Sequence, residues 1–392
     1  MLLSIALIFL IGLLFGKVFA KIKLPPLFGM IIAGIIIGPF VLNRIDDSIL
    51  NVSSEIRKIA LIIILIRAGL SLDISDLKKA GCPALLLCFL PACFEITGMV
   101  LIAPALMNVS RTDAAIMGAV VAAVSPAVIV PRMIKLIDEG YGRDKSIPQM
   151  ILAGASVDDV FVIVIFTVFT GLAQGEKISV VSFLNIPISI FAGIVTGIIV
   201  GVLLSLLFSK FIKNSTVQTI VLLSFSMLLT ATEDMLLEFI PFASLIAVMV
   251  VGIVIKNKQA EIASDLKKQY NSLWTAAEVF LFVLVGASVD IHYAASAGLT
   301  VVFVVLGALL VRIAGVAVCL VKTNLSFKER LFCMIAYTPK ATVQAAIGGI
   351  PLSMGLSCGN TVLTVAVMAI LITAPIGAFG IDYTYKKLLK KQ

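Results

Sequence analysis

The sequence predicts an all-α integral membrane protein that crosses the bilayer many times. Hydrophobic residues make up 60% of the 392 residues and charged residues only 13%, and the mean hydropathy is +1.16. Apolar runs recur from end to end with short links between them. Because a soluble domain carries about 25% charged residues, we expect one continuous membrane unit over residues 1–392 and no soluble domain.

Thirteen apolar runs are candidates for membrane-spanning helices, since a helix needs about 20 residues to cross the hydrocarbon core. Their approximate ranges are 2–19, 24–42, 58–72, 82–107, 113–136, 148–173, 181–209, 216–233, 235–256, 273–289, 293–321, 328–354 and 360–383. Basic residues follow the first run rather than precede it, which is the reverse of a secretory signal. We therefore expect this run to stay attached, with the N-terminus outside.

The basic residues fall mostly on one side of the membrane. With the N-terminus outside, 22 of the 30 Lys and Arg residues lie in links on the cytoplasmic side. This asymmetry supports an odd number of spans and a cytoplasmic C-terminus. It also explains the net charge of +8 as topology, so we expect no nucleic-acid partner.

Several classes of function lack the residues that they require. The single histidine, His292, excludes a histidine-rich zinc site and an H-E-x-x-H hydrolase. The six cysteines lack paired metal-ligand spacing and are interpreted as core residues. With no phosphate-binding loop either, we expect neither an enzyme nor a bound cofactor.

Two spans contain an internal proline beside polar residues. Residues 123–131 read AVSPAVIVP in the fifth span, and residues 336–344 read AYTPKATVQ in the twelfth. Proline removes an amide donor and clashes with the preceding turn, so both helices are predicted to break near mid-membrane. The breaks lie seven spans apart, so the two helices cross in opposite directions. Spans 1–6 and 8–13 are therefore predicted to be inverted repeats, with two ordinary proline kinks as the alternative.

Residues 154–160, GASVDDV, place two adjacent carboxylates in an apolar run. An ionised aspartate at the centre of a membrane helix costs roughly 2.5–3.5 kcal/mol on insertion scales, so Asp158 and Asp159 are candidate functional residues. Consecutive helical residues differ by about 100° in direction, which predicts different roles for the two. One is expected to be held ionised by Lys340, while the other exchanges a proton for a small cation. The alternative is a buried structural cluster.

Other polar residues inside the spans can support this cation site. Glu95 and Arg312 occupy matching positions in spans 4 and 11, and we expect them to pair, in a structural or a gating role. Carboxylate and hydroxyl oxygens suit hard cations. The hydroxyl-bearing candidates for additional ligands are Ser125, Ser156 and Thr338.

Together these motifs resemble the monovalent cation:proton antiporter superfamily, in its two-aspartate branch, and within it the sodium/proton exchanger subfamily B. The matching strings are residues 67–73, 91–95, 123–131, 154–160, 338–348 and 371–377. The resemblance implies a homodimer that exchanges Na⁺ or Li⁺ for H⁺ by an elevator movement. It further implies an ion-binding core formed by helices within 82–173 and 293–383, and a dimerisation scaffold within 1–72 and 181–289.

The resemblance also implies roles for individual residues. It places cation and proton binding on Asp159, a salt bridge to Lys340 on Asp158, and a charged pair in the core on Glu95 and Arg312. The compact chain is similar to bacterial members without a regulatory C-terminal domain, so we expect a bacterial plasma membrane.

Two alternatives keep the membrane setting but change the activity. A K⁺/H⁺ antiporter would need a larger, less charged site, and a gated cation channel would also tolerate carboxylates in the membrane. The stoichiometry is open as well. If Lys340 releases its proton when Asp158 takes part in cation binding, two protons move per Na⁺, whereas a permanently charged lysine makes the exchange one for one.

Overall fold

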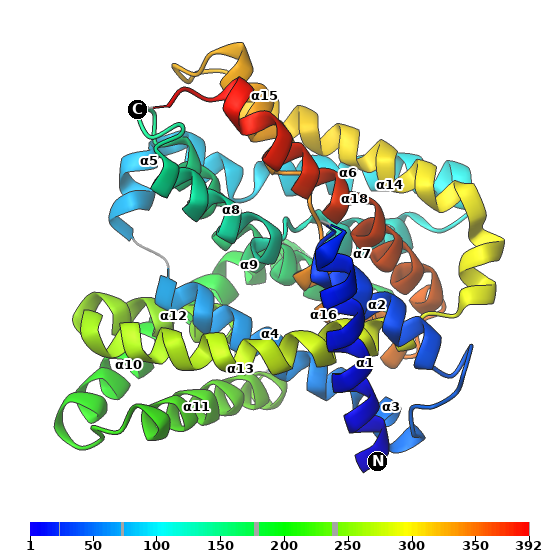
Figure 1. Ribbon diagram of the computed structural model, residues 1–392, viewed down its shortest axis with the longest axis horizontal. Helices are drawn as coiled ribbons and strands as arrows, with labels where there is room; N and C mark the ends of the chain where they lie inside the picture. Colours follow the sequence, from blue (N-terminus) through cyan, green and yellow to red (C-terminus); the bar gives the residue numbers. More distant parts are fainter. Residues whose placement is uncertain (23, 72–73, 176–179, 237–241, 392) are drawn as a thin grey trace. The chain divides into compact units, whose positions relative to one another are not determined.

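The computed structural model describes residues 1–22, 24–71, 74–175, 180–236 and 242–391, but not the side chains of 74–80, 156–157, 160, 180–187, 234–236 and 293–297. The described chain is helical, and its one β-type pairing is an isolated antiparallel bridge between Tyr141 and Lys391. The predicted all-α class is therefore confirmed (Figure 1).

The helices are numbered in chain order in Figure 1. They are α1 (Leu2–Lys21), α2 (Pro26–Ile37), α3 (Asp47–Asn51), α4 (Ser53–Ser71), α5 (Ile74–Leu87), α6 (Leu90–Met107), α7 (Arg111–Ala122), α8 (Pro126–Glu139), α9 (Ile147–Ala173), α10 (Val180–Lys210), α11 (Ser215–Leu236), α12 (Ser244–Lys258), α13 (Ala260–Ala287), α14 (Ile291–Cys319), α15 (Phe327–Ala336), α16 (Thr342–Ile347), α17 (Ile350–Ser353) and α18 (Gly359–Leu388).

Eight segments of the described chain are long and apolar enough to cross a membrane. They are Leu2–Lys21, Gly81–Met107, Arg111–Glu139, Ile188–Lys210, Ser215–Glu233, Ala260–Ala287, Gly298–Cys319 and Gly359–Leu388. Shorter apolar helices accompany them, and the predicted twelfth span contains three helical pieces, α15, α16 and α17. The membrane-spanning character is confirmed, whereas the number of thirteen spans and the inverted repeats stay predictions.

The chain forms two compact units. The first contains Met1–Ser54, Ile74–Gly175 and Leu281–Gln392, and the second contains Glu55–Asp73 and Glu176–Phe280. The predicted core ranges 82–173 and 293–383 fall in the first unit, which also contains the N-terminal helices α1 and α2 that we had grouped with the scaffold. The division into an ion-binding and a dimerising part stays a prediction.

Both predicted helix breaks are present. In the fifth predicted span α7 ends at Ala122 and α8 begins at Pro126, and Ser125 between them has extended backbone (φ −86°, ψ 109°). Proline is well tolerated at the first position of a helix because no intrahelical partner exists there for its missing N–H. In the twelfth span α15 ends at Ala336 and α16 begins at Thr342.

The helix that carries the two aspartates is anchored by an apolar stripe. Ile147, Ile151 and Ala155 of α9 are buried, and their spacing of four residues keeps them near one face of the helix. They pack in a core with residues of α8, α15 and α18. The stripe continues to Asp158 and Asp159, so the same packing that orders α9 carries both carboxylates into the interior.

The close approach of α2 and α13 provides a test of the helix packing in the first unit. A Cβ atom on Gly34 of α2 would overlap the carbonyl oxygen of Val283 in α13. Backbone cannot move aside as a side chain can, so Gly34→Ala is expected to lower the free energy of unfolding by about 1–3 kcal/mol. This exceeds the roughly 1 kcal/mol that alanine gains as a helix former. Thermal unfolding of purified protein in detergent measures the change.

The matched control for this prediction is Gly16→Ala in α1. Its Cβ would first meet the terminal methyl of Met30 at 3.1 Å, which is the mobile end of a flexible side chain. We expect no loss of stability, and a gain of up to about 1 kcal/mol because alanine is the better helix former. Equal losses for the two variants would contradict the assigned close approach of α2 and α13.

Candidate ion-binding site

The site begins with the packing of α6 against α14, which lie side by side in Figure 1. This packing brings Glu95 of α6 and Arg312 of α14 together, with 2.9 Å between Oε2 and Nη1. Glu95 is 2% exposed and Arg312 is fully buried. The predicted Glu95–Arg312 pair is therefore confirmed, and its two members compensate each other's charge away from water.

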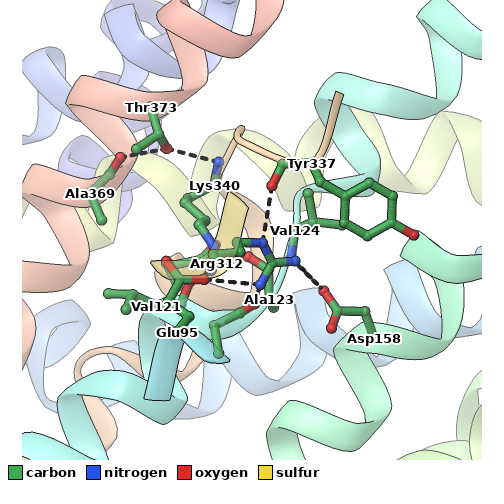
Figure 2. A network of polar contacts seen from close by, with 12 residues as sticks. Glu95, Val121, Ala123, Val124, Asp158, Arg312, Tyr337, Lys340, Ala369 and Thr373 are labelled. Atoms are coloured by element: carbon green, nitrogen blue, oxygen red, sulfur yellow. Dashed lines mark hydrogen bonds and ion pairs between the residues drawn. The ribbon is translucent and has the colours of Figure 1, made fainter. Parts of the chain in front are cut away.

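Arg312 connects this pair to the aspartates and to both helix breaks. Its Nη2 lies 2.9 Å from Oδ2 of Asp158, and its Nε donates to the carbonyl oxygen of Tyr337 at 3.0 Å. Its Nη1 also donates to the carbonyl oxygen of Ala122, the last residue of α7. Figure 2 shows the guanidinium at the centre of the network. The rigid planar fork of arginine suits this task, because it presents five donors in fixed directions.

Lys340 pairs with Glu95 and not with Asp158. Its Nζ lies 2.5 Å from Oε2 of Glu95, the same oxygen that accepts from Arg312. The prediction of an Asp158–Lys340 salt bridge is wrong for this structure. The physical reason is where the two cations lie: Arg312 lies against Oδ2 of Asp158 and neutralises that carboxylate, while the Lys340 ammonium lies against Oε2 of Glu95.

The freed backbone of the first break is satisfied by other parts of the site. The N–H of Val124 donates to Oδ2 of Asp158 at 2.9 Å, and the N–H of Ser125 donates to the carbonyl oxygen of Pro339 at 2.8 Å. The side-chain amide of Gln344 donates to the carbonyl oxygen of Ala123 at 2.7 Å. The Ser125–Pro339 bond joins the two breaks, and the other two bonds connect the first break to α9 and α16. Irregular backbone is tolerated at membrane depth when its polar groups are satisfied in this way.

Gln344 and Thr373 are site residues to which the sequence analysis assigned no role. Gln344 is fully buried and connects α16, which follows the second break, to the carbonyl oxygen of Ala123 in the first break. The hydroxyl of Thr373 in α18 accepts from the N–H of Lys340 at 3.0 Å and donates to the carbonyl oxygen of Ala369 at 2.7 Å. Both residues lie in the strings that carried the family resemblance, 338–348 and 371–377, and their position there was the available signal.

The two aspartates have different surroundings, as predicted. Asp158 is fully buried and has both the Arg312 guanidinium and the Val124 amide as partners on Oδ2. Asp159 is 5% exposed, and its Oδ1 is buried without a hydrogen-bond partner in the described chain. Oδ1 of Asp158 is likewise without one. Buried oxygens of this kind are acceptors that a cation or a proton can satisfy.

The candidate hydroxyl ligands divide into three cases. Ser125 is fully buried and its Oγ has no hydrogen-bond partner among the described residues, so it is free to contribute an oxygen ligand. Thr338 donates its hydroxyl hydrogen to the carbonyl oxygen of Ile335 at 2.9 Å. The side chain of Ser156 lies outside the described part of the structure. Thr342 adds a buried hydroxyl oxygen, also without a described partner, that we had not singled out.

The network holds more acid than base. Three carboxylates, Glu95, Asp158 and Asp159, share one region of the first unit with two cations, Arg312 and Lys340. With every group ionised the network has a formal charge of −1, which a bound monovalent cation or a proton neutralises.

Comparison with known proteins gives the chain its family. The family described as "Sodium/hydrogen exchanger, transmembrane" matches residues 5–387. The chain belongs to the sodium/hydrogen exchanger family. It is 32% identical to sodium/hydrogen exchanger 9B2 of Mus musculus, over 99% of this chain and 74% of that protein. It is 33% identical to sodium/hydrogen exchanger 9B1 of the same organism, over 99% of this chain and 71% of that protein.

The fold has a solved counterpart as well. The sodium proton antiporter MjNhaP1 from Methanocaldococcus jannaschii superposes with a TM-score of 0.86 at 22% identity, covering 98% of this chain and 97% of that one. At this identity the likeness concerns the fold. The whole-chain matches agree with the sequence analysis, which reached subfamily B of the sodium/proton exchangers from the motifs.

The sharing of Arg312 yields a stability test. Removing it in Arg312→Gln leaves Asp158 without its cation and withdraws donors from two backbone carbonyls. We therefore expect the free energy of unfolding to fall by about 3–5 kcal/mol, the cost of breaking a buried ion pair. Lys340→Gln removes one of two cations on Glu95 and is expected to cost less. Thermal unfolding of the two variants in the same detergent compares them.

A second substitution separates charge from packing in this test. In Arg312→Gln/Asp158→Asn the uncompensated carboxylate is gone, so part of the lost stability should return. A loss for Lys340→Gln as large as that for Arg312→Gln would contradict the central place of Arg312. So would a double variant with no gain over the single one.

Proposed function

We propose that the protein is a secondary-active antiporter that exchanges Na⁺ or Li⁺ for H⁺ by alternating access. The single observation that carries the proposal is the uncompensated carboxylate of the network. Asp159 is buried, has an oxygen without a described partner and lies beside a carboxylate already neutralised by Arg312. Membership in the sodium/hydrogen exchanger family and the names of its relatives support cation and proton as substrates.

The charge of the network provides the physical basis for coupling. Without a substrate the network carries −1, and moving an uncompensated charge through a low-dielectric region is costly. Binding one monovalent cation or one proton at Asp159 makes the network neutral. The carrier therefore changes sides when loaded with either substrate and not when empty, which is the requirement for obligatory exchange.

The oxygen atoms available as ligands in the site favour a small hard cation. Carboxylate and hydroxyl oxygens prefer hard ions, and Ser125 and Asp158 each have a buried oxygen without a described partner. Protons and Na⁺ compete for the same carboxylate, so a lower pH on one side should raise the Na⁺ concentration needed for half-maximal exchange there.

Movement and assembly complete the proposal. The two breaks are held together by the bonds between Ser125 and Pro339 and between Gln344 and Ala123. This connection favours a core that moves as one body, and we propose an elevator movement of that core. We also propose a homodimer in a plasma membrane with a cytoplasmic C-terminus, as the resemblance and the basic links imply.

The site assignment is tested in proteoliposomes with a preset pH gradient. Addition of Na⁺ or Li⁺ should collapse the gradient with the wild type but not with Asp159→Asn, which removes the uncompensated charge. The matched control is Asp138→Asn, which changes an exposed acid at the end of α8 and should retain exchange within about twofold of the wild type. Normal exchange by Asp159→Asn would show that the site is wrong.

Two further arms of the same assay separate the alternatives. Collapse by K⁺ as effective as collapse by Na⁺ would favour a K⁺/H⁺ antiporter. Conductance beyond carrier turnover, without obligatory proton movement, would favour a channel.

The pairing of Lys340 leads to a prediction about stoichiometry. Because its ammonium lies on Glu95 and not on Asp158, cation binding at the aspartates does not displace it from its partner. We therefore expect one H⁺ per Na⁺ and no net current. Current measurement on reconstituted protein checks this, and Lys340→Gln should leave the exchange electroneutral if it still transports. A sustained current from the wild type that disappears in Lys340→Gln would contradict it and favour two protons per Na⁺.

A further inference from the structure

Tyr337 is a buried polar residue that the exchange mechanism does not use. It directly follows Ala336, the last residue of α15, at the second break and is 1% exposed. Its hydroxyl has no hydrogen-bond partner in the described part of the chain. A buried hydroxyl without a partner is unfavourable, and phenylalanine would avoid that cost. The role of the Tyr337 hydroxyl is therefore something other than a hydrogen bond within the described chain.

The backbone and ring of Tyr337 contact the counterion of Asp158. Its carbonyl oxygen accepts from Nε of Arg312 at 3.0 Å, and the guanidinium carbon lies 5.7 Å from the ring centroid, within cation–π range. Figure 2 shows the tyrosine ring beside both Arg312 and Asp158, with its hydroxyl directed away from the guanidinium. The backbone carbonyl and the ring of Tyr337 thus both contact the Arg312 guanidinium.

The hydroxyl contacts the helix of the aspartates on the other side. A Cβ atom on Gly154 of α9 would overlap the Tyr337 hydroxyl oxygen and would lie 3.3 Å from the Cζ that bears it and 2.9 Å from Cβ of Leu87. Gly154 precedes Asp158 by four residues, so both lie near one face of α9, one turn apart. The absence of a side chain at Gly154 is what makes room for the hydroxyl.

We propose that Tyr337 is a positioning residue that sets the approach of α9 to Arg312 through the contact of its hydroxyl with Gly154, and thereby the affinity of the aspartate pair for its cation. The inference rests on the function proposed above and deepens it. Tyr337 spaces a carboxylate-bearing helix from the guanidinium that neutralises Asp158. A change in that spacing alters how firmly Arg312 holds Asp158 and how far its second oxygen is available to a cation.

The proposal predicts a specific coupling between the two positions. Tyr337→Phe removes the spacer and should raise the apparent KM for Na⁺ by about threefold to tenfold, with the maximal rate within about twofold, since contacting residues couple by such amounts. Gly154→Ala pushes α9 away from the hydroxyl and should raise KM further. In Gly154→Ala/Tyr337→Phe the added methyl takes part of the space of the lost oxygen, so KM should return toward the wild-type value.

The experiment measures Na⁺-dependent collapse of the pH gradient for the wild type, both single variants and the double variant, together with the unfolding temperature of each. The control for crowding as such is Gly307→Ala in α14, whose Cβ would meet the terminal methyl of Ile102 at 2.9 Å, far along a flexible side chain. It should leave KM unchanged. If Gly154→Ala fails to fold, recovery of folding in the double variant reports the same coupling.

The possible results either support or overturn the assignment. A KM effect of Gly154→Ala that is smaller in the phenylalanine background supports it. Equal effects of Gly154→Ala on KM in the wild-type and phenylalanine backgrounds overturn it. A Tyr337→Phe protein with wild-type KM overturns it as well. If Tyr337→Phe lowers the stability and the maximal rate but leaves KM unchanged, Tyr337 is only a packing residue. Failure of the proposed function is seen separately, because the wild type itself would then not exchange Na⁺, Li⁺ or K⁺ for protons.

Discussion

The candidate site depends on one buried guanidinium. Arg312 reaches the carboxylates of Glu95 and Asp158 and the carbonyl oxygens of Ala122 and Tyr337. Ala122 ends α7 and Tyr337 directly follows α15, and these two helices precede the two breaks. The same group therefore holds α6, α9 and both interrupted spans together. A buried arginine is acceptable only when its charge and its donors are satisfied. The packing of this part of the first unit must therefore supply four acceptors at fixed positions.

This arrangement leaves one carboxylate without a compensating cation, and that uncompensated charge allows the network to bind an ion. Glu95 is shared by two cations and Asp158 has a cation and an amide, whereas Asp159 has an uncompensated charge. A fully paired cluster would be a stable structural element without a reason to bind an ion. A network that lacks one positive charge binds a cation or a proton, and its neutrality when loaded links binding to movement in a low-dielectric surrounding.

Much of this was predictable from local chemistry in the sequence. The breaks were located by Pro126 and Pro339, because proline acts on its own turn and needs no information about neighbours. The Glu95–Arg312 pair followed from the matching positions of the two residues in spans 4 and 11, together with the cost of isolated charges in apolar helices. The family followed from motifs distributed over nearly the whole chain, and the all-α class from composition and the length of the apolar runs.

The sequence by itself thus determined the class, the family, the breaks and the set of charged residues, since each depends on local composition and short-range chemistry. Only the tertiary structure decided which charges meet: Lys340 lies on Glu95, and Arg312 takes Asp158. It also revealed Gln344 across the two breaks and the hydroxyl of Tyr337 over Gly154. These contacts depend on the rotation and separation of helices far apart in the chain, which apolar periodicity leaves undetermined.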